Sequence, residues 1–118
     1  MRPGRIASLP SVDLLGSGGG SGPVWGTETE DLNATLLAWG PGKGSPAHVN
    51  AERDVLLVVV AGSASVALGD ERHLLRPGGA LVLPKGYSRS IAAGPEGVRY
   101  LSVHRRRAPL QVAPRSRR

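Results

Sequence analysis

The sequence predicts an all-β fold, an antiparallel sandwich or barrel formed by one domain. Three observations favour it. The apolar segments are short and separated by glycine, proline and aspartate, several of them are β-branched or alternate with small polar residues, and none shows a sustained 3.6-residue apolar period. The chain has 118 residues, 40% of them hydrophobic, which suits one compact domain with its own core.

The chain divides into three parts by composition. Residues 1–23 form a predicted flexible arm that ends in a Gly/Ser-rich linker, residues 24–104 form the β-rich body, and residues 105–118 form a basic Arg/Pro-rich tail. Within the arm, the weakly apolar segment 6–15 is suited either to pairing with a sheet edge or to disorder.

Predicted strands follow one another through the body between turn residues. Gly69-Asp70 predicts a tight hairpin turn, and residues 93–97 predict another turn. Residues 55–61 are apolar throughout, which predicts a strand covered on both faces. The full set of predicted strands is 32–39, 55–61, 63–68, 72–75, 80–83, 89–92 and 98–104.

Charge and composition exclude several classes of function. The chain has no cysteine, so disulfides, thiolate metal sites and cysteine nucleophiles are excluded. The formal net charge is +6, but six of the 15 basic residues lie after residue 104, so residues 1–104 carry nine basic and nine acidic residues. The body therefore lacks the charge pattern of a nucleic-acid-binding protein, and only the tail has it. No apolar run approaches the length of a membrane helix or a secretory signal, which predicts a cytoplasmic protein without membrane association.

Glycines, prolines and one histidine recur at fixed spacings in the body. Two stretches carry them, Gly42-x5-His48-x-Asn50 continuing to Gly62, and Gly78-x5-Pro84-x-Gly86-x2-Arg89. This pattern resembles the cupin superfamily, whose motifs are G-x5-H-x-H-x3,4-E-x6-G and G-x5-P-x-G-x2-H-x3-N. The resemblance covers residues 24–104 and implies a single-domain, double-stranded β-helix (jelly-roll) cupin barrel, in which the glycines and prolines form the corners.

The resemblance also implies where the family's metal ligands would lie, and here the sequence departs from it. His48 keeps the first histidine position, but Asn50 takes the second and Arg89 takes the last. The glutamate position falls on Val55 if Gly62 fixes the register, or on Asp54 with the shorter spacing. A guanidinium has no lone pair for a metal and attracts carboxylate or phosphate instead.

We therefore expect a protein that binds a small, anionic metabolite, a carboxylate or phosphate, inside the barrel without the usual four-ligand metal site and without a cofactor. Whether it also catalyses a reaction stays open. Arg89 would clamp the anion, and His48 and Asn50 would donate orienting hydrogen bonds. An apolar wall and two aromatic residues complete the predicted ligand site, at Val55, Tyr87 and Trp39. Two other interpretations remain, in which Arg89 pairs with Glu96 at the surface and Asn50 only caps a turn.

An alternative hypothesis restores the metal. In an extended chain His48, Asn50, Glu52 and Asp54 lie on one face, and His104 ends the last predicted strand. His48, Glu52 and His104 would then bind a divalent ion, Fe, Mn, Ni or Zn, in a metal-dependent enzyme resembling cupin dioxygenases or isomerases. The expected partners are the small-molecule ligand and a second copy of the chain, since single-domain cupins commonly dimerise and pairing through the 6–15 segment would cover an open sheet edge. Nucleic-acid binding through the basic tail is the remote third hypothesis.

Overall fold

The structure is a computed structural model, and it describes residues 10–16 and 20–106. About half of the predicted arm and nearly all of the predicted tail therefore lie outside the described residues. Strands occupy most of the described part, and they are β1 (Gly22–Glu28), β2 (Leu32–Trp39), β3 (Gly44–Val49), β4 (Val55–Leu68), β5 (Glu71–Leu75), β6 (Ala80–Leu83) and β7 (Ser88–Arg105). The described residues contain no helix that is long and apolar enough to span a membrane.

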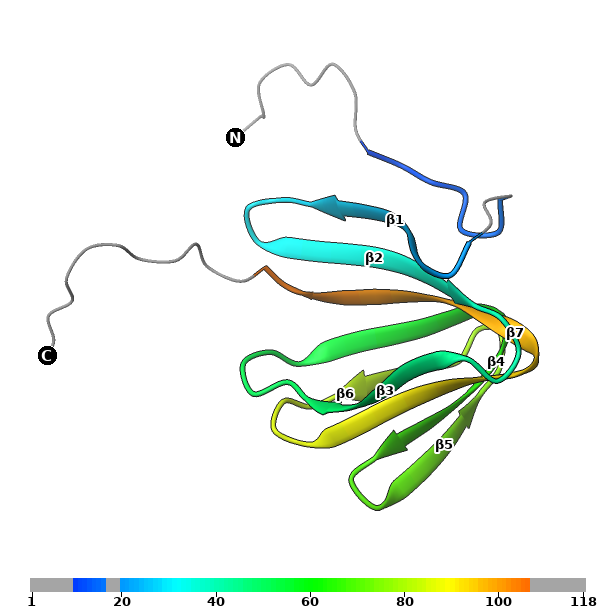
Figure 1. The fold of residues 1–118 in the computed structure, drawn as a ribbon. Helices are drawn as coiled ribbons and strands as arrows, with labels where there is room; N and C mark the ends of the chain where they lie inside the picture. The colour runs from blue at the N-terminus through cyan, green and yellow to red at the C-terminus, as the bar shows by residue number, and fades with distance from the viewer. Residues whose placement is uncertain (1–9, 17–19, 107–118) are drawn as a thin grey trace, which may run out of the picture.

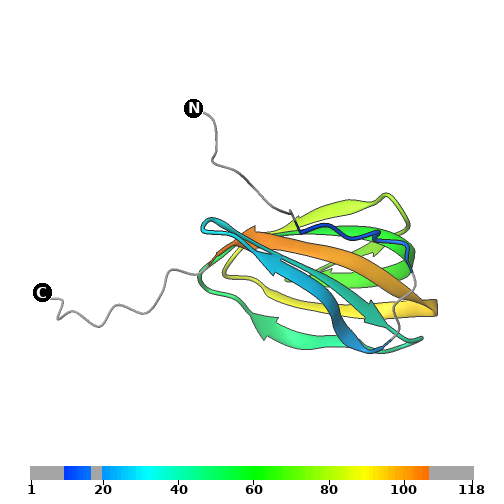
Figure 2. The same ribbon diagram turned by 90° about the horizontal axis from the view of Figure 1, so that it is seen from above.

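The strands form two leaves that share the long strands β4 and β7, and all pairings are antiparallel. The first leaf has the strand order β1, β2, β7, β4, β6. It uses the second half of β7 and the first half of β4. The second leaf has the strand order β3, β7, β4, β5. It uses the first half of β7 and the second half of β4. Figure 1 shows the two leaves joined where β4 and β7 bend and open at the opposite end, and Figure 2 shows them from above. This is a double-stranded β-helix.

The bend in β4 and β7 changes two predicted features. Residues 55–61 and 63–68 belong to one strand, and the predicted turn at 93–97 lies inside β7. The register of the β4–β7 pair shifts between Val59 and Ala61 and again between Gly62 and Ala64, so β-bulges bend both strands without ending them. Gly62 has φ +72°, and a Cβ there would collide with the carbonyl of Gly97 across the pair. The glycine therefore allows the corner that turns one leaf into the other.

The inward faces of both leaves supply the core. In the first half of β4, Val55, Leu57 and Val59 are buried, whereas Leu56 between them is 41% exposed. The expectation that this strand is covered on both faces is therefore wrong for the described residues, because only one face of an antiparallel leaf packs against the core. The buried cluster consists of Val55, Leu57, Val59, Ala64, Val66, Leu75, Leu83, Ile91, Ala93, Val98 and Tyr100.

Two loops at the open end are fixed to each other. The backbone N–H of Gly86 donates to the carbonyl of Asn50 at 2.8 Å. The backbone N–H of Lys85 donates to Oδ1 of Asp54 at 2.9 Å. These bonds join the β3–β4 loop to the β6–β7 loop, so the entrance to the interior has a defined shape.

Candidate functional site

A cavity of about 180 Å³ lies between the two leaves. Side chains from β2, β3, β4, β6 and β7 line it, so every wall comes from a hydrogen-bonded strand. The lining residues are Leu37, Trp39, Ser45, His48, Val55, Leu57, Leu83, Arg89, Ile91, Tyr100 and Ser102. We call this space the inner pocket. Four of the six residues predicted for the ligand site line it, at His48, Val55, Arg89 and Trp39.

Arg89 is the charged residue of the inner pocket with the most unusual surroundings. It is only 8% exposed, and its Nη1 is buried without a hydrogen-bond partner. No aspartate or glutamate lines the inner pocket, and none of the ion pairs found among the described residues involves Arg89. Burial lowers the pKa of Arg89, and the charge of Arg53 lowers it further. The interpretation that Arg89 points outward to a surface partner therefore does not describe this structure.

His48 lies directly opposite Arg89 in the β3–β7 pair. Its side chain is largely exposed at the edge of the inner pocket, and its Nδ1 is 2.9 Å from the carbonyl oxygen of Pro46. A carbonyl only accepts hydrogen bonds, so Nδ1 carries the proton and donates it. In the neutral ring Nε2 is then an acceptor, and in the protonated ring it becomes a second donor.

Asn50 does not line the inner pocket. Its Oδ1 accepts hydrogen bonds from the backbone N–H groups of Glu52 and Arg53, at 2.9 and 3.1 Å. The sequence allowed two roles for Asn50, ligand binding or capping a turn, and this arrangement is a turn cap. Asn50 thus shapes the loop from which Arg53 projects.

The remaining predicted residue, Tyr87, lies apart from the others. Its side chain is 54% exposed and lines a separate cavity beside the β4–β5 turn, together with Leu68, Gly69 and Asp70. The β6–β7 loop turns Tyr87 outward while Arg89 points inward. The structure therefore does not bring Tyr87 to the inner pocket.

Three polar residues of the inner pocket were not predicted from the sequence: Ser45, Tyr100 and Ser102. Tyr100 is 2% exposed, and its hydroxyl accepts a hydrogen bond from Nε1 of Trp39 at 3.2 Å. Burial raises the pKa of Tyr100, although this hydrogen bond and the charge of Arg89 oppose the rise. Period-two alternation in the predicted strand 98–104 places Tyr100 and Ser102 on one face, but the sequence does not say which face is inward.

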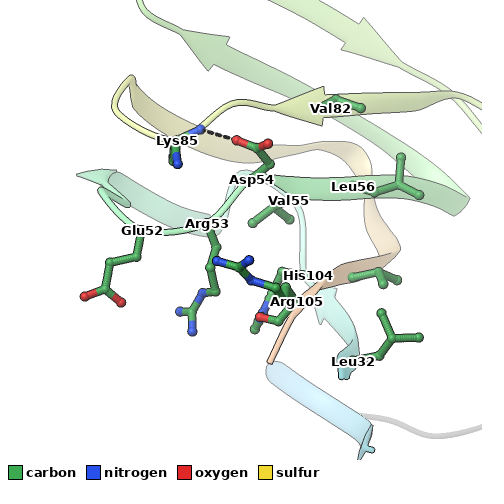
Figure 3. Close-up of a pocket in the computed structure, with 11 residues that line it drawn as sticks. Leu32, Glu52, Arg53, Asp54, Val55, Leu56, Val82, Lys85, His104 and Arg105 are labelled. Carbon is green, nitrogen blue, oxygen red and sulfur yellow. Dashed lines mark hydrogen bonds between the residues drawn. The ribbon is translucent and has the colours of Figure 1, made fainter. Parts of the chain in front are cut away.

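A second cavity, of about 480 Å³, lies at the open end of the barrel, and we call it the mouth cavity. Figure 3 shows Arg53, His104 and Arg105 gathered on one side of it, and the bond between Lys85 and Asp54 on another. Val55 lines both the mouth cavity and the inner pocket, so the two spaces are neighbours. Arg53 is half-buried, and its Nε is buried without a hydrogen-bond partner.

The alternative metal set is not brought together. Glu52 and His104 line the mouth cavity, whereas His48 lines the inner pocket. Nδ1 of His104 lies 2.9 Å from the carbonyl of Arg105. In residues 10–16 and 20–106, no group of three or more histidine, aspartate or glutamate residues is placed to hold a metal ion.

The inner pocket also does not fit the divalent metal that the cupin resemblance implies. Of the family's four ligand positions, only His48 offers a metal donor to this space. Val55 puts an isopropyl group at the glutamate position, and Arg89 adds a positive charge with no lone pair. A hard or borderline divalent cation requires several oxygen or nitrogen ligands, and the pocket lacks a carboxylate to balance the charge.

Comparison with solved structures defines the class of protein. KdgF from Halomonas sp. is 26% identical over 70% of this chain and 74% of its own, with a TM-score of 0.65. A cupin-2 domain protein from Shewanella frigidimarina is 22% identical over 79% and 86%, with a TM-score of 0.61. An uncharacterised double-stranded β-helix protein from Klebsiella pneumoniae is 19% identical over 83% and 90%, with a TM-score of 0.70. The sequence matches no protein-family model and no curated protein sequence.

The two leaves and the pocket between them thus define a single small double-stranded β-helix domain, as the sequence predicted. Since solved structures named as cupin and double-stranded β-helix domains share this architecture, the chain has the fold of a small cupin. The cupin motifs identified in the sequence agree with that assignment. Its metal-ligand positions, however, are filled by side chains of different chemistry.

Proposed function

We propose that the protein binds a small anionic metabolite in the inner pocket, with Arg89 as the anchor for a carboxylate or phosphoryl group. The observation that supports this most directly is the buried Nη1 of Arg89, which has no partner in a pocket lined by no acidic residue. Guanidinium groups bind planar, anionic oxygen pairs through parallel N–H donors. An anion in the inner pocket would give Arg89 the partner that the described residues do not provide.

The energetics favour a ligand over an empty pocket. A buried charge without a partner costs several kcal/mol of desolvation, even after the surroundings relax. A ligand anion would recover part of that cost as binding energy, because the guanidinium is already dehydrated and held by the β3–β7 pairing. A buried positive group without a partner thus supports an anion as the ligand.

The other lining residues limit what the anion can be. The hydroxyls of Ser45 and Ser102 can donate hydrogen bonds to the anion, and Nε2 of His48 adds a donor at the edge when the ring is protonated. Aliphatic side chains form the opposite walls, at Leu57, Leu83 and Ile91. A cavity of about 180 Å³ is smaller than a typical drug-sized site, so it suits a ligand of a few non-hydrogen atoms.

A thermal-shift screen of small carboxylates, phosphate and sulfate tests the proposal. At a ligand concentration of about 100 times Kd, binding to the folded state stabilises the protein by about 2.7 kcal/mol. Arg89→Gln should lose this stabilisation, whereas Arg76→Gln, at an exposed arginine in the β5–β6 turn that does not line the inner pocket, should retain it. Equal stabilisation of wild type and Arg89→Gln would refute the proposal. So would stoichiometric Fe, Mn, Ni or Zn in the purified protein that is lost in His48→Ala.

A further inference from the structure

The surroundings of Arg53 point to the charge of the ligand. Arg53 lies in the β3–β4 loop two residues before Val55, where it is half-buried between the exposed Glu52 and Asp54. Val55 separates the inner pocket from the mouth cavity and lines both. Arg53 therefore lines a cavity that borders the inner pocket at Val55.

Arg53 shares the unusual state of Arg89. The Nε of Arg53 is buried without a hydrogen-bond partner, although acidic residues flank it in the sequence. Asp54 accepts a hydrogen bond from the backbone of Lys85 instead, and neither Asp54 nor Glu52 bonds to Nε of Arg53. The positive charge of Arg53 also acts on Arg89, since it lowers the pKa of that residue. Like charges that approach each other in a partly dehydrated site are destabilising unless an anion lies near both.

The loop geometry holds Arg53 in this place. Oδ1 of Asn50 accepts the backbone N–H of Arg53 at 3.1 Å, and the carbonyl of Asn50 accepts the N–H of Gly86 at 2.8 Å. The β3–β4 loop is thus fixed both internally and to the β6–β7 loop. The backbone that carries Arg53 is therefore held in place, and the Nε of its side chain is buried.

We infer that the ligand is a small dianion, either a dicarboxylate or a phosphoryl compound, that lies between Arg89 in the inner pocket and Arg53 at the mouth. The inference rests on the proposed function, and it adds the second charge and the second anchor. Each buried, unpartnered N–H takes one anionic oxygen of the ligand. The dianion also removes the repulsion between the two guanidinium groups, which a monoanion bound at Arg89 alone would leave largely in place.

Isothermal titration with a matched charge series tests this inference. Propionate supplies one carboxylate and malonate two, and inorganic phosphate supplies the phosphoryl alternative, all at one ionic strength and at a pH where malonate is fully ionised. Wild type should bind malonate or phosphate about tenfold or more tightly than propionate, because the second anion gains a charged hydrogen bond. Whichever dianion binds more tightly identifies the chemical source.

The variants separate the two anchors. Arg53→Gln should reduce the preference for the dianion to about twofold or less while changing the affinity for propionate by less than about twofold. Arg89→Gln should abolish binding of all three probes, and Arg76→Gln should change none of them. Circular dichroism and unfolding midpoints confirm that each variant is folded.

The possible failures are distinguishable. If wild type binds propionate as tightly as it binds both malonate and phosphate, or if Arg53→Gln keeps the full preference, the dianion inference is refuted while the anion pocket stands. If no probe binds wild type, or if Arg89→Gln binds as wild type does, the proposed function itself is refuted.

Discussion

Replacing Arg89 with methionine should stabilise the protein in the absence of ligand. Most substitutions of a buried residue destabilise, so this prediction has an unusual sign. Its reason is that Arg89 is 8% exposed, that its Nη1 has no partner, and that no acidic side chain lines the inner pocket. Methionine keeps a long flexible stem in the same space and removes the dehydrated charge.

The magnitude follows from comparison with buried ion pairs. Replacing a fully paired buried ion pair by apolar residues of similar volume is neutral or stabilises by about 1–4 kcal/mol. Arg89 lacks even the partner that offsets part of the cost, so we expect a gain of about 1–4 kcal/mol. A domain of this size shifts its Tm by about 4 °C per kcal/mol, which gives a rise of about 4–16 °C.

Chemical denaturation and thermal unfolding in a buffer free of carboxylates, phosphate and sulfate measure this effect. Arg76→Met is the matched control, because Arg76 is exposed and surface substitutions usually change stability by less than about 0.5 kcal/mol. Saturating ligand should reverse the order and make wild type the more stable protein. If Arg89→Met is destabilised by several kcal/mol in the anion-free buffer, Arg89 is satisfied in the folded protein and the reasoning is refuted.

Three further predictions concern the walls of the pocket and the corner of the fold. Burial raises the pKa of Tyr100 above its usual value of 10.0, so between about pH 10 and that raised pKa the unfolded state loses a proton that the folded state keeps. The free energy of unfolding should therefore fall as pH rises through this window, and it should fall less in Tyr100→Phe. In Tyr87→Phe, where Tyr100 is the remaining one of two tyrosines, phenolate absorbance should appear only above pH 10. Trp39→Phe removes the hydrogen bond to the Tyr100 hydroxyl and should cost about 1 kcal/mol in urea denaturation; an unchanged midpoint would mean that the bond contributes nothing. Gly62→Ala forces a Cβ onto a residue with φ +72° and into a backbone carbonyl, so it should cost at least about 1–2 kcal/mol, whereas Gly40→Ala meets nothing within 4 Å and should cost far less; equal costs would contradict this account of the corner.

The fold could be predicted from the sequence because turn residues fix it. The glycines and prolines of both motifs mark corners whose spacing is independent of the residues between them, and Gly42, Gly62, Gly78 and Gly86 all have positive φ. What the spacing did not show is that a corner can lie inside a strand. Residues 93–97 contain two glycines and a proline, which locally favour a turn. They stay within β7 because pairing with β4 holds the chain on both sides, at Ala93 and at Val98, although residues 94–97 have no partner in β4.

The site was only partly predictable, for a different reason. The motif positions placed Arg89, His48 and Val55 around one pocket. In barrels of this fold, residues at the same motif position lie at the same place on a strand and point to the same side of it. Hydrogen-bond partners are decided by the loops instead, and these turned the Asn50 carboxamide toward its own backbone and Tyr87 toward the outside. Arg53 was not among the predicted site residues, since its buried Nε depends on packing that local sequence does not specify.

The substitutions at the ligand positions are consistent with one another, and this argues for an inverted site rather than a decayed one. A divalent ion about 4 Å from the Arg89 guanidinium would be repelled by about 8 kcal/mol at an effective dielectric constant of about 20. Loss of the glutamate alone would leave a weak metal site, but Val55 and Arg89 together remove the negative charge and add a positive one. Arg53 then adds a second positive charge beside the first. A pocket that had merely lost its metal would have no reason to bury two unpaired guanidinium N–H groups, whereas a pocket for an anion requires such donors.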